Sequence, residues 1–402
     1  MINIQNFYHE WVIQFAMKNN SKFSGYCGWV ILFLLTGLRI GFGFGQKLTL
    51  PIIRAHSKIV TVRDGNVFKK GAWTISPEIR PDVYSTFCDS GIKQITFYTD
   101  IDSLSIRLSK WQSFNFIILC QKDSAYTSIK CVESYMGSLK AGGNYDTVQN
   151  TKLKLNSIHF TYQSADTPEL VQLKKKYNLD SVAGGGNEVS KVLNLLHWVH
   201  NKITHDGNKR NPGKIYNALG YIEECTYNNK TLNCRGLATV LNECYLSMGF
   251  ASRFITCLPK DTSDFDCHVI NMVYLKSLNK WIWIDPTNDA YVMDEKGNLL
   301  GIEEVRFRLI NNQPLILNPD ANWNRKQSTT IEDYLYTYMT KNLFRFCCPL
   351  DSKYNCEEIK EGKKIEYIYL LPNNDDFDYR ANNSENRHYN FTRNEKIFFG
   401  KP

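Results

Sequence analysis

Three residues of chemically reactive type occur where they could act together. Cys234 stands at the predicted start of a helix, His268 opens a predicted strand, and Asp285 ends the next predicted strand. A cysteine thiolate is a nucleophile, a histidine can take up and return a proton, and a carboxylate can orient the imidazole ring. Together the three residues have the parts of a Cys-His-Asp triad that attacks a carbonyl carbon.

The helix that carries Cys234 is predicted from its start signal and its apolar spacing. Asn233 is a good N-cap residue, apolar residues recur after it at helical spacing, and Gly249 is typical of a helix end. In the first turn, unpaired backbone N–H groups and the helix dipole favour a thiolate at Cys234. The backbone N–H of Cys234 would supply one donor to an oxyanion; the sequence does not identify the second, for which residues 227–229 are candidates.

The other two residues are predicted to lie on one β-hairpin. Residues 268–275 and 280–285 read as strands, with a turn between them. The midpoint of positions 268 and 285 is 276.5, inside that turn, so His268 and Asp285 are expected to face each other on adjacent antiparallel strands. A proline follows Asp285, and because proline cannot donate to a β-ladder it fits the end of the strand.

Each of these residues also has a purely structural interpretation. Cys234 is one of 12 cysteines and could be a buried structural cysteine, His268 a loop histidine and Asp285 a turn-capping carboxylate. The sequence contains no Cys-x-x-Cys pair and no Cys/His zinc spacing, so we expect no metal site and no cofactor. His197 and His200 are interpreted as ordinary histidines on the polar face of a helix.

Four short segments resemble the transglutaminase-like superfamily, and the resemblance covers roughly residues 165–345 with a weaker tail to 402. The segments are NCRGLA at 233–238, MGFASR at 248–253, HV at 268–269 and WIDPT at 283–287. The resemblance implies a papain-like α+β fold in which Cys234 is the nucleophile, His268 the general base and Asp285 the orienting carboxylate.

The resemblance also implies an activity. The expected enzyme attacks a peptide or amide carbonyl and forms an acyl-enzyme, as a protease, an amidase or an acyltransferase, with hydrolysis favoured over cross-linking. Its expected partner is a polypeptide or glycopeptide substrate. The alternative is a non-catalytic binding module that uses the same fold to hold a peptide or a glycan.

Two domains are expected after the N-terminal segment. Residues 46–162 read as a β-sandwich of immunoglobulin-like size, because short strands alternate with turns there. Residues 163–402 form the transglutaminase-like domain, whose first helix signal is Thr167 followed by Pro168. A β domain before this fold is similar to the arrangement in exported bacterial members. The predicted sandwich strands are 58–62, 94–98, 104–108, 114–119 and 153–161.

Residues 1–45 have the pattern of a secretory signal peptide. Lys18 and Lys22 precede an apolar run at residues 29–38, and a stretch of glycine and phenylalanine ends at Gly45. This run is too short to span a bilayer as a stable helix. We therefore expect cleavage near Gly45, export to the periplasm or the extracellular space, and no stable membrane span in the mature chain. An uncleaved membrane anchor is the alternative.

The composition is that of an ordinary globular protein. Of the 402 residues, 43% are hydrophobic and 22% are charged, which excludes a mostly disordered chain and a polytopic membrane protein. The net charge of +8 is modest and spread along the chain, so it does not indicate nucleic-acid binding. In an oxidising environment some cysteines could pair, with a connectivity that the sequence leaves open.

Overall fold

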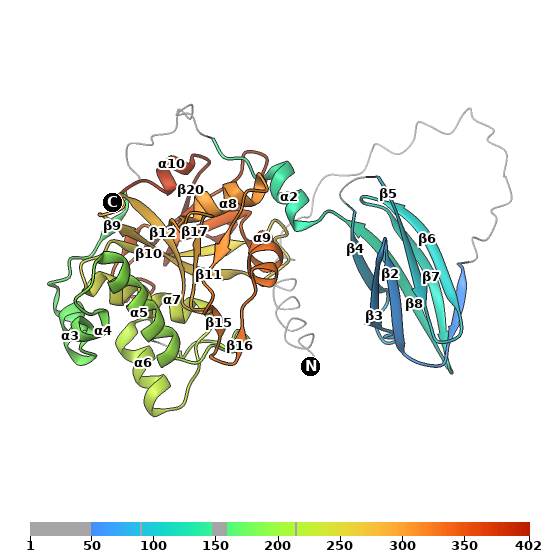
Figure 1. Ribbon diagram of the computed structural model, residues 1–402, viewed down its shortest axis with the longest axis horizontal. Helices are drawn as coiled ribbons and strands as arrows, with labels where there is room; N and C mark the ends of the chain where they lie inside the picture. The colour runs from blue at the N-terminus through green and yellow to red at the C-terminus, as the bar shows by residue number, and fades with distance from the viewer. Residues whose placement is uncertain (1–49, 89–90, 147–158, 214) are drawn as a thin grey trace, which may run out of the picture. The chain divides into compact units, whose positions relative to one another are not determined.

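The computed structural model describes residues 50–88, 91–146, 159–213 and 215–402 (Figure 1). The predicted signal segment and most of the predicted strand 153–161 lie outside these residues. Among the helices of the described part, none is long and apolar enough to cross a membrane.

Two four-stranded sheets form the first part of the described chain. Their strand orders are β1-β7-β8-β4 and β3-β2-β5-β6, and one hydrophobic cluster with members from both sheets fills the space between them. This arrangement is the β-sandwich that the short strands predict. The strands are β1 Ile52–Ala55, β2 Ile59–Asp64, β3 Val67–Thr74, β4 Asp82–Phe87, β5 Ile92–Tyr98, β6 Ser103–Ser109, β7 Ser113–Cys120 and β8 Asp123–Val132.

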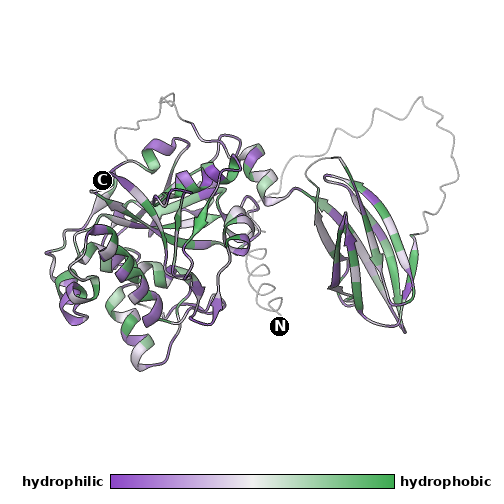
Figure 2. Cartoon of the chain, in the orientation of Figure 1, coloured by the Kyte–Doolittle hydropathy of each residue, from purple (hydrophilic) through white to green (hydrophobic). Residues whose placement is uncertain are grey.

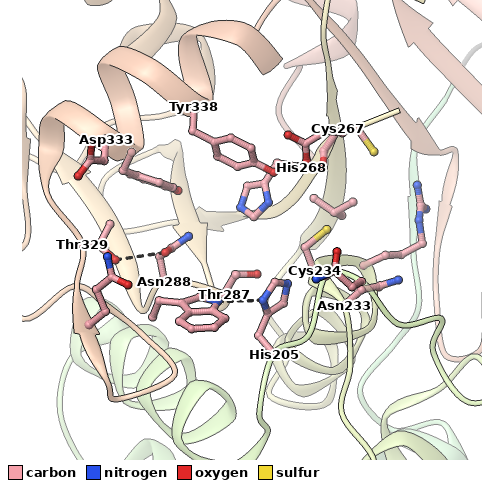
Figure 3. A pocket seen from close by; sticks show the side chains of 18 of the residues that line it. His205, Asn233, Cys234, Cys267, His268, Thr287, Asn288, Thr329, Asp333 and Tyr338 are labelled. Carbon is pink, nitrogen blue, oxygen red and sulfur yellow. Dashed lines mark hydrogen bonds between the residues drawn. The ribbon is translucent and has the colours of Figure 1, made fainter. Parts of the chain in front are cut away.

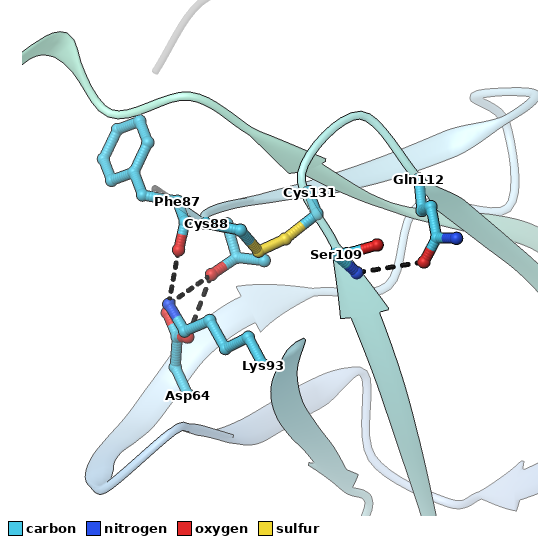
Figure 4. Close-up of a disulfide and its surroundings, with 8 residues drawn as sticks. Asp64, Phe87, Cys88, Lys93, Ser109, Gln112 and Cys131 are labelled. Carbon is cyan, nitrogen blue, oxygen red and sulfur yellow. Dashed lines mark hydrogen bonds and ion pairs between the residues drawn. A yellow bond between two sulfur atoms is a disulfide. The ribbon is translucent and has the colours of Figure 1, made fainter. Parts of the chain in front are cut away.

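Strand β8 is the longest strand of the sandwich, and the sequence patterns did not predict it. Its buried positions include Ala125, Thr127 and Cys131, which are small or partly polar. Such residues give a weak alternation signal although they face the core. Cys131 forms a disulfide with Cys88, across 43 residues of sequence and with a Cα–Cα separation of 5.6 Å (Figure 4).

An eight-stranded mixed sheet is the centre of the second part. Its strand order is β14-β13-β12-β11-β10-β17-β19-β20, and all neighbours are antiparallel except β19 and β20. Hydrophobic residues are concentrated along its strands (Figure 2). The strands are β10 Ser252–Leu258, β11 His268–Leu275, β12 Lys280–Asp285, β13 Ala290–Met293, β14 Ile316–Leu317, β17 Arg345–Pro349, β19 Ile365–Leu370 and β20 Arg387–Thr392.

Helices cover both faces of this sheet (Figure 1). On one face α5, α6 and α7 pack against Val273 and Ile282, and on the other α8 and η3 pack against Ile270 and Trp283. A sheet with helices on both faces is the mixed α+β fold that the resemblance implies. The helices are α2 Tyr135–Gly142, α3 Pro168–Lys176, α4 Leu179–Ala183, α5 Glu188–Lys202, α6 Ala218–Tyr227, α7 Cys234–Ser247, α8 Ile302–Ile310, η3 Glu332–Met339, α9 Thr340–Asn342, η4 Tyr379–Asn382 and α10 Glu395–Phe398.

Two further short strand pairs and the residues around α2 complete the description of these residues. Strand β9 (Thr161–Tyr162) pairs with β18 (Asp351–Ser352), and β15 (Asn322–Trp323) pairs with β16 (Gln327–Ser328). Leu139 of α2 belongs to the hydrophobic cluster of the central sheet. The domain boundary near residue 163 stays a prediction.

Candidate functional site

Cys234 is the first residue of helix α7, and hydrogen bonds from outside the helix hold this end in place. Asn233 is the N-cap, and its Oδ1 accepts from the backbone N–H of Gly236 at 3.2 Å. Asn211 contacts Asn233 twice: its Oδ1 accepts from the Asn233 backbone N–H and its Nδ2 donates to Asn233 Oδ1, each at 2.9 Å. A Cβ atom at Gly236 would lie 2.7 Å from Asn211 Oδ1, so only glycine leaves room for this clamp.

The hairpin of β11 and β12 forms, but its register differs from the predicted one. Asn271 lies opposite Ile284, which centres the hairpin at 277.5 rather than at 276.5. His268 and Asp285 are therefore diagonal rather than direct neighbours. The pairing is displaced by two residues in total, one on each strand. Because this displacement is even, the side-chain alternation is preserved and both residues stay on one face of the sheet.

Asn271 also ties the hairpin to the cysteine helix. It points to the opposite face of β11 from His268, and its Nδ2 donates to the carbonyl of Ala238 in α7 at 2.9 Å. The Asn271 side chain is fully buried, and breaking its hydrogen bond would leave a buried amide without a partner, which costs free energy. This bond fixes the distance between the first turn of α7 and the start of β11.

His268 and Asp285 form a buried hydrogen-bonded pair. His268 Nε2 lies 2.7 Å from Asp285 Oδ2, which leaves Nδ1 as the ring nitrogen available to Cys234. Burial raises the pKa of Asp285, but the charge and the hydrogen bond of His268 outweigh it and lower the pKa to about 2. Burial lowers the pKa of His268, yet the charge of Asp285 raises it well above its ordinary value. The charged pair is therefore the favoured state.

Other donors converge on the same carboxylate. Asp285 Oδ1 accepts from the backbone N–H of Thr287 at 2.8 Å, and Oδ2 accepts from Asn288 Nδ2 at 3.1 Å and from the Tyr334 hydroxyl at 2.7 Å. Trp283 Nε1 donates to the Tyr334 oxygen at 3.1 Å. Tyr334 lies on η3, a π-helix, a rare form that is frequent at functional sites.

Cys234 has the electrostatic environment of a reactive thiol. Burial raises its pKa, but side-chain hydrogen bonds with His205 and His268 and the charge of His268 lower it to about 6. Two cysteines of the same part of the chain show the opposite behaviour: burial raises the pKa of Cys225 to about 11 and that of Cys257 well above its ordinary value. Cys234 is thus the described cysteine best prepared to carry a negative charge.

Cys234 and His268 line a cavity of about 740 Å³ (Figure 3). His205, Asn288 and Tyr338 line it as well, and the Tyr338 ring packs edge-on against the His268 ring with centroids 5.3 Å apart. The structure thus brings two of the predicted site residues together in one cavity. The third, Asp285, lies behind His268, fully buried.

The interpretation of His200 was wrong, and the residues beside the cavity differ from the candidates 227–229. Residues 227–229, where the second oxyanion donor was sought, do not line the cavity, and Tyr227 is 77% exposed. His205 lines the cavity instead, next to Cys234, and no sequence motif marked it. His200 is buried rather than on a polar face, and bonds to the carbonyl of Pro286 at 3.0 Å.

His197 takes part in a cluster that could hold a cation. Its Nδ1 lies 2.6 Å from Asp289 Oδ2, and the donor atoms of His197, Asp289 and Asp320 lie within 4.8 Å of one another. The hydrogen bond with Asp289 raises the pKa of His197 and so favours the imidazolium form. Together, His197, Asp289 and Asp320 form a charged hydrogen-bonded network in this structure.

Solved structures similar to this chain include the following three. One is a candidate cysteine protease from Cytophaga hutchinsonii, with 19% sequence identity over 36% of this chain and 46% of that chain and a TM-score of 0.24. Another is the transglutaminase of red sea bream, with 10% identity over 60% of this chain and 49% of that chain and a TM-score of 0.22. The third is a candidate protease from Parabacteroides distasonis ATCC 8503, with 15% identity over 50% of this chain and 37% of that chain and a TM-score of 0.20.

The chain spans less than half the length of each of these proteins, and none of the curated proteins matches it. A family model gives a clearer result. The model described as the transglutaminase-like superfamily matches residues 175–286, the segment that contains Cys234, His268 and Asp285. Over residues 175–286, therefore, this chain is similar to the core of the transglutaminase-like superfamily.

Proposed function

We propose that this chain is an exported cysteine enzyme that attacks a peptide or amide carbonyl. The observation that most strongly supports this proposal is that a low-pKa thiol and a histidine line one cavity while a buried carboxylate holds the histidine ring. Cys234 lies at a helix start, and the pKa of its thiol is lowered to about 6, while His268 Nε2 bonds to Asp285 at 2.7 Å.

The proposed reaction proceeds in two stages. The Cys234 thiolate attacks the carbonyl carbon, and His268 delivers a proton from Nδ1 to the leaving nitrogen as the C–N bond breaks. Water or an amine then attacks the thioester carbon, His268 takes the proton of the attacking group, and the carbon–sulfur bond breaks to release the Cys234 thiolate and the acid or amide. Asp285 keeps the proton on Nε2 and stabilises the imidazolium in both stages.

The substrate class follows from this chemistry. The cavity of about 740 Å³ is large enough for several residues of a polypeptide or glycopeptide, and aromatic side chains such as Trp323 and Tyr338 line it. Hydrolysis is favoured over acyl transfer. A non-catalytic module that holds a peptide or a glycan in the same cavity is the competing proposal, and the labelling experiment below distinguishes the two.

Iodoacetamide should label Cys234 faster than any other cysteine at neutral pH. The thiolate is the reactive form and the pKa of Cys234 is lowered to about 6, so the rate should rise through about pH 6 and level off above about pH 7. An ordinary thiol would still be gaining reactivity at about pH 8.5. Mass spectrometry of tryptic peptides across a pH series measures this profile for each cysteine.

The same preparation is then tested on peptide, glutamine-amide and glycopeptide substrates, with and without an added primary amine. Release of amine or ammonia supports hydrolysis, and incorporation of the added amine supports acyl transfer. Labelling of Cys234 at the rate of a free thiol, in a protein inert to every substrate, would support the binding module instead.

The Cys88–Cys131 disulfide supports the export part of the proposal, because disulfides persist in oxidising compartments. The mature chain should begin near Gln46 in protein recovered from the native host. Mass spectrometry of the N-terminal peptide in the secreted or periplasmic fraction measures this. An intact N-terminus recovered from the membrane fraction would contradict cleavage and support the anchor.

A further inference from the structure

His205 is held beside Cys234 by contacts that fix its backbone. It forms an isolated β-bridge with Leu232, two residues before the cysteine. Its backbone N–H donates to Asn324 Oδ1 at 2.7 Å, and its carbonyl accepts from Asn324 Nδ2 at 2.9 Å. A residue clamped on both sides of its peptide unit presents its ring in one orientation, as a preorganised catalytic group requires.

The ring of His205 has a defined tautomer. Trp323 Nε1 lies 3.0 Å from His205 Nδ1, and an indole N–H can only donate. Nδ1 must therefore carry the lone pair, and the proton of the neutral ring is on Nε2.

The Nε2 atom of His205 is buried, and within the described part of the chain the Cys234 thiol is the group that it faces. Figure 3 shows the rings of His205 and His268 both turned toward Cys234. Buried polar atoms are normally paired, and this N–H has only the reacting sulfur beside it, so it is placed to donate to an oxygen that the substrate brings next to that sulfur.

We propose that His205 is a further catalytic residue that donates its Nε2–H to the carbonyl oxygen during attack. This inference rests on the function proposed above. The second donor is the backbone N–H of Cys234, which has no intrahelical acceptor because it belongs to the first turn of α7. Together the two N–H groups form an oxyanion hole.

The electron flow gives His205 a role that changes during the reaction. Before attack, the negative charge is on Cys234 Sγ, beside Nε2–H. As the Sγ–carbon bond forms, the π electrons of the C=O bond move to oxygen, and the charge that the donor meets moves with them. When the C=O bond re-forms, the bond from carbon to the leaving group breaks. The Nε2–H of His205 thus faces the sulfur before attack and the carbonyl oxygen during attack. We expect it to stabilise the oxyanion more than the thiolate, because His268 also stabilises the thiolate but does not contact the oxyanion.

Two probes separate these roles. Acylation of Cys234 by p-nitrophenyl acetate passes through an oxyanion and releases p-nitrophenolate, which needs no proton from His268. Alkylation by iodoacetamide is a displacement at carbon and forms no oxyanion. The ratio of the two rates in one variant therefore reports on oxyanion stabilisation alone.

The substitution His205→Leu should lower the acylation rate by about 100-fold or more, the usual effect of one oxyanion donor, and the alkylation rate by less than about tenfold. His205→Gln should restore most of the acylation rate, since its amide N–H reaches the place of Nε2–H. Trp323→Phe tests the positioning residue: without the indole donor the proton can move to Nδ1, so acylation should fall while alkylation is kept. Thermal unfolding of each variant verifies that it is folded.

Equal losses in both rates for His205→Leu would overturn the proposal, and so would His205→Gln behaving like His205→Leu. If His205→Leu does not fold, the other two variants are compared with the unsubstituted chain. Near-normal acylation in His205→Gln and a selective loss of acylation in Trp323→Phe would support the proposal, and equal losses of both rates in Trp323→Phe would overturn it. A failure of the proposed function is a different result: the unsubstituted chain would then react slowly at Cys234 with both probes.

Discussion

Replacing Cys234 with alanine is expected to abolish turnover. The thiolate forms the acyl bond. Cys267 also lines the cavity, but burial raises the pKa of its thiol, so it is a poorer nucleophile than Cys234. Loss of a triad nucleophile typically costs on the order of 10⁶-fold in kcat. The rate is measured on whichever member of the peptide, glutamine-amide and glycopeptide panel the unsubstituted chain processes fastest.

The fold should survive this substitution. Cys234 is only partly buried and occupies the first turn of α7, so its side chain contributes little core volume. Cys225→Ala is the matched control: Cys225 is also partly buried, on the neighbouring helix α6, and lies outside the cavity. Activity within about twofold of the unsubstituted chain is expected for this control. Retained turnover in Cys234→Ala, in a preparation free of unsubstituted protein, would contradict the proposed nucleophile.

Replacing Asp285 with asparagine is expected to lower kcat by about 10⁴-fold, as removal of the carboxylate charge does in other triads. Asp285 accepts from four donors, one of them His268. An amide must place an NH₂ group against some of these donors. If that group faces His268, the ring must accept at Nε2 and carry its proton on Nδ1, the wrong tautomer to take a proton from a thiol.

A pH profile distinguishes this role from a merely structural one. The negative charge of Asp285 stabilises the imidazolium, which in turn stabilises the thiolate of Cys234. Without that charge the pKa of Cys234 should rise, and the midpoint of the iodoacetamide profile should move upward from about pH 6 toward that of an ordinary thiol. A loss of activity with an unmoved midpoint would indicate that Asp285 serves stability alone.

Asp289→Asn is the matched control for this variant. Asp289 is likewise buried, forms a histidine–carboxylate pair at 2.6 Å with His197, and lies four residues further along the chain, but it does not line the cavity. We expect this control to lose stability, because it weakens a buried charged pair, and to keep the alkylation midpoint of the unsubstituted chain. An equal shift in both variants would show that the effect is not specific to Asp285.

The order of the site elements could be predicted because it depends on local signals. Asn233 as N-cap places Cys234 in the first turn of a helix, and helix α7 begins there in the structure. The alternation of residues 268–275 and 280–285 predicts two paired strands, and β11 and β12 form with those bounds. The predicted hairpin pairing was displaced by two residues in total, one on each strand. An even displacement leaves His268 and Asp285 on the same face of the sheet.

The residues that complete the site could not be read from the sequence. His205 lies 118 residues before Trp323, and Tyr334 lies 49 residues after Asp285, so only the packing of the sheet and its helices brings them to the site. None of them lies in a motif, and an aromatic-rich stretch such as 323–346 is as compatible with core packing as with a site.

Sequence by itself determined the nature and order of the reactive groups in this protein, because helix caps and strand alternation act over a few residues. Only the tertiary structure decided which side chains meet those groups. Long-range packing sets which donors face Asp285, which indole fixes the tautomer of His205, and whether an imidazole is buried beside the thiol. Hydrogen bonds and pKa values depend on those distances, and no local pattern encodes them.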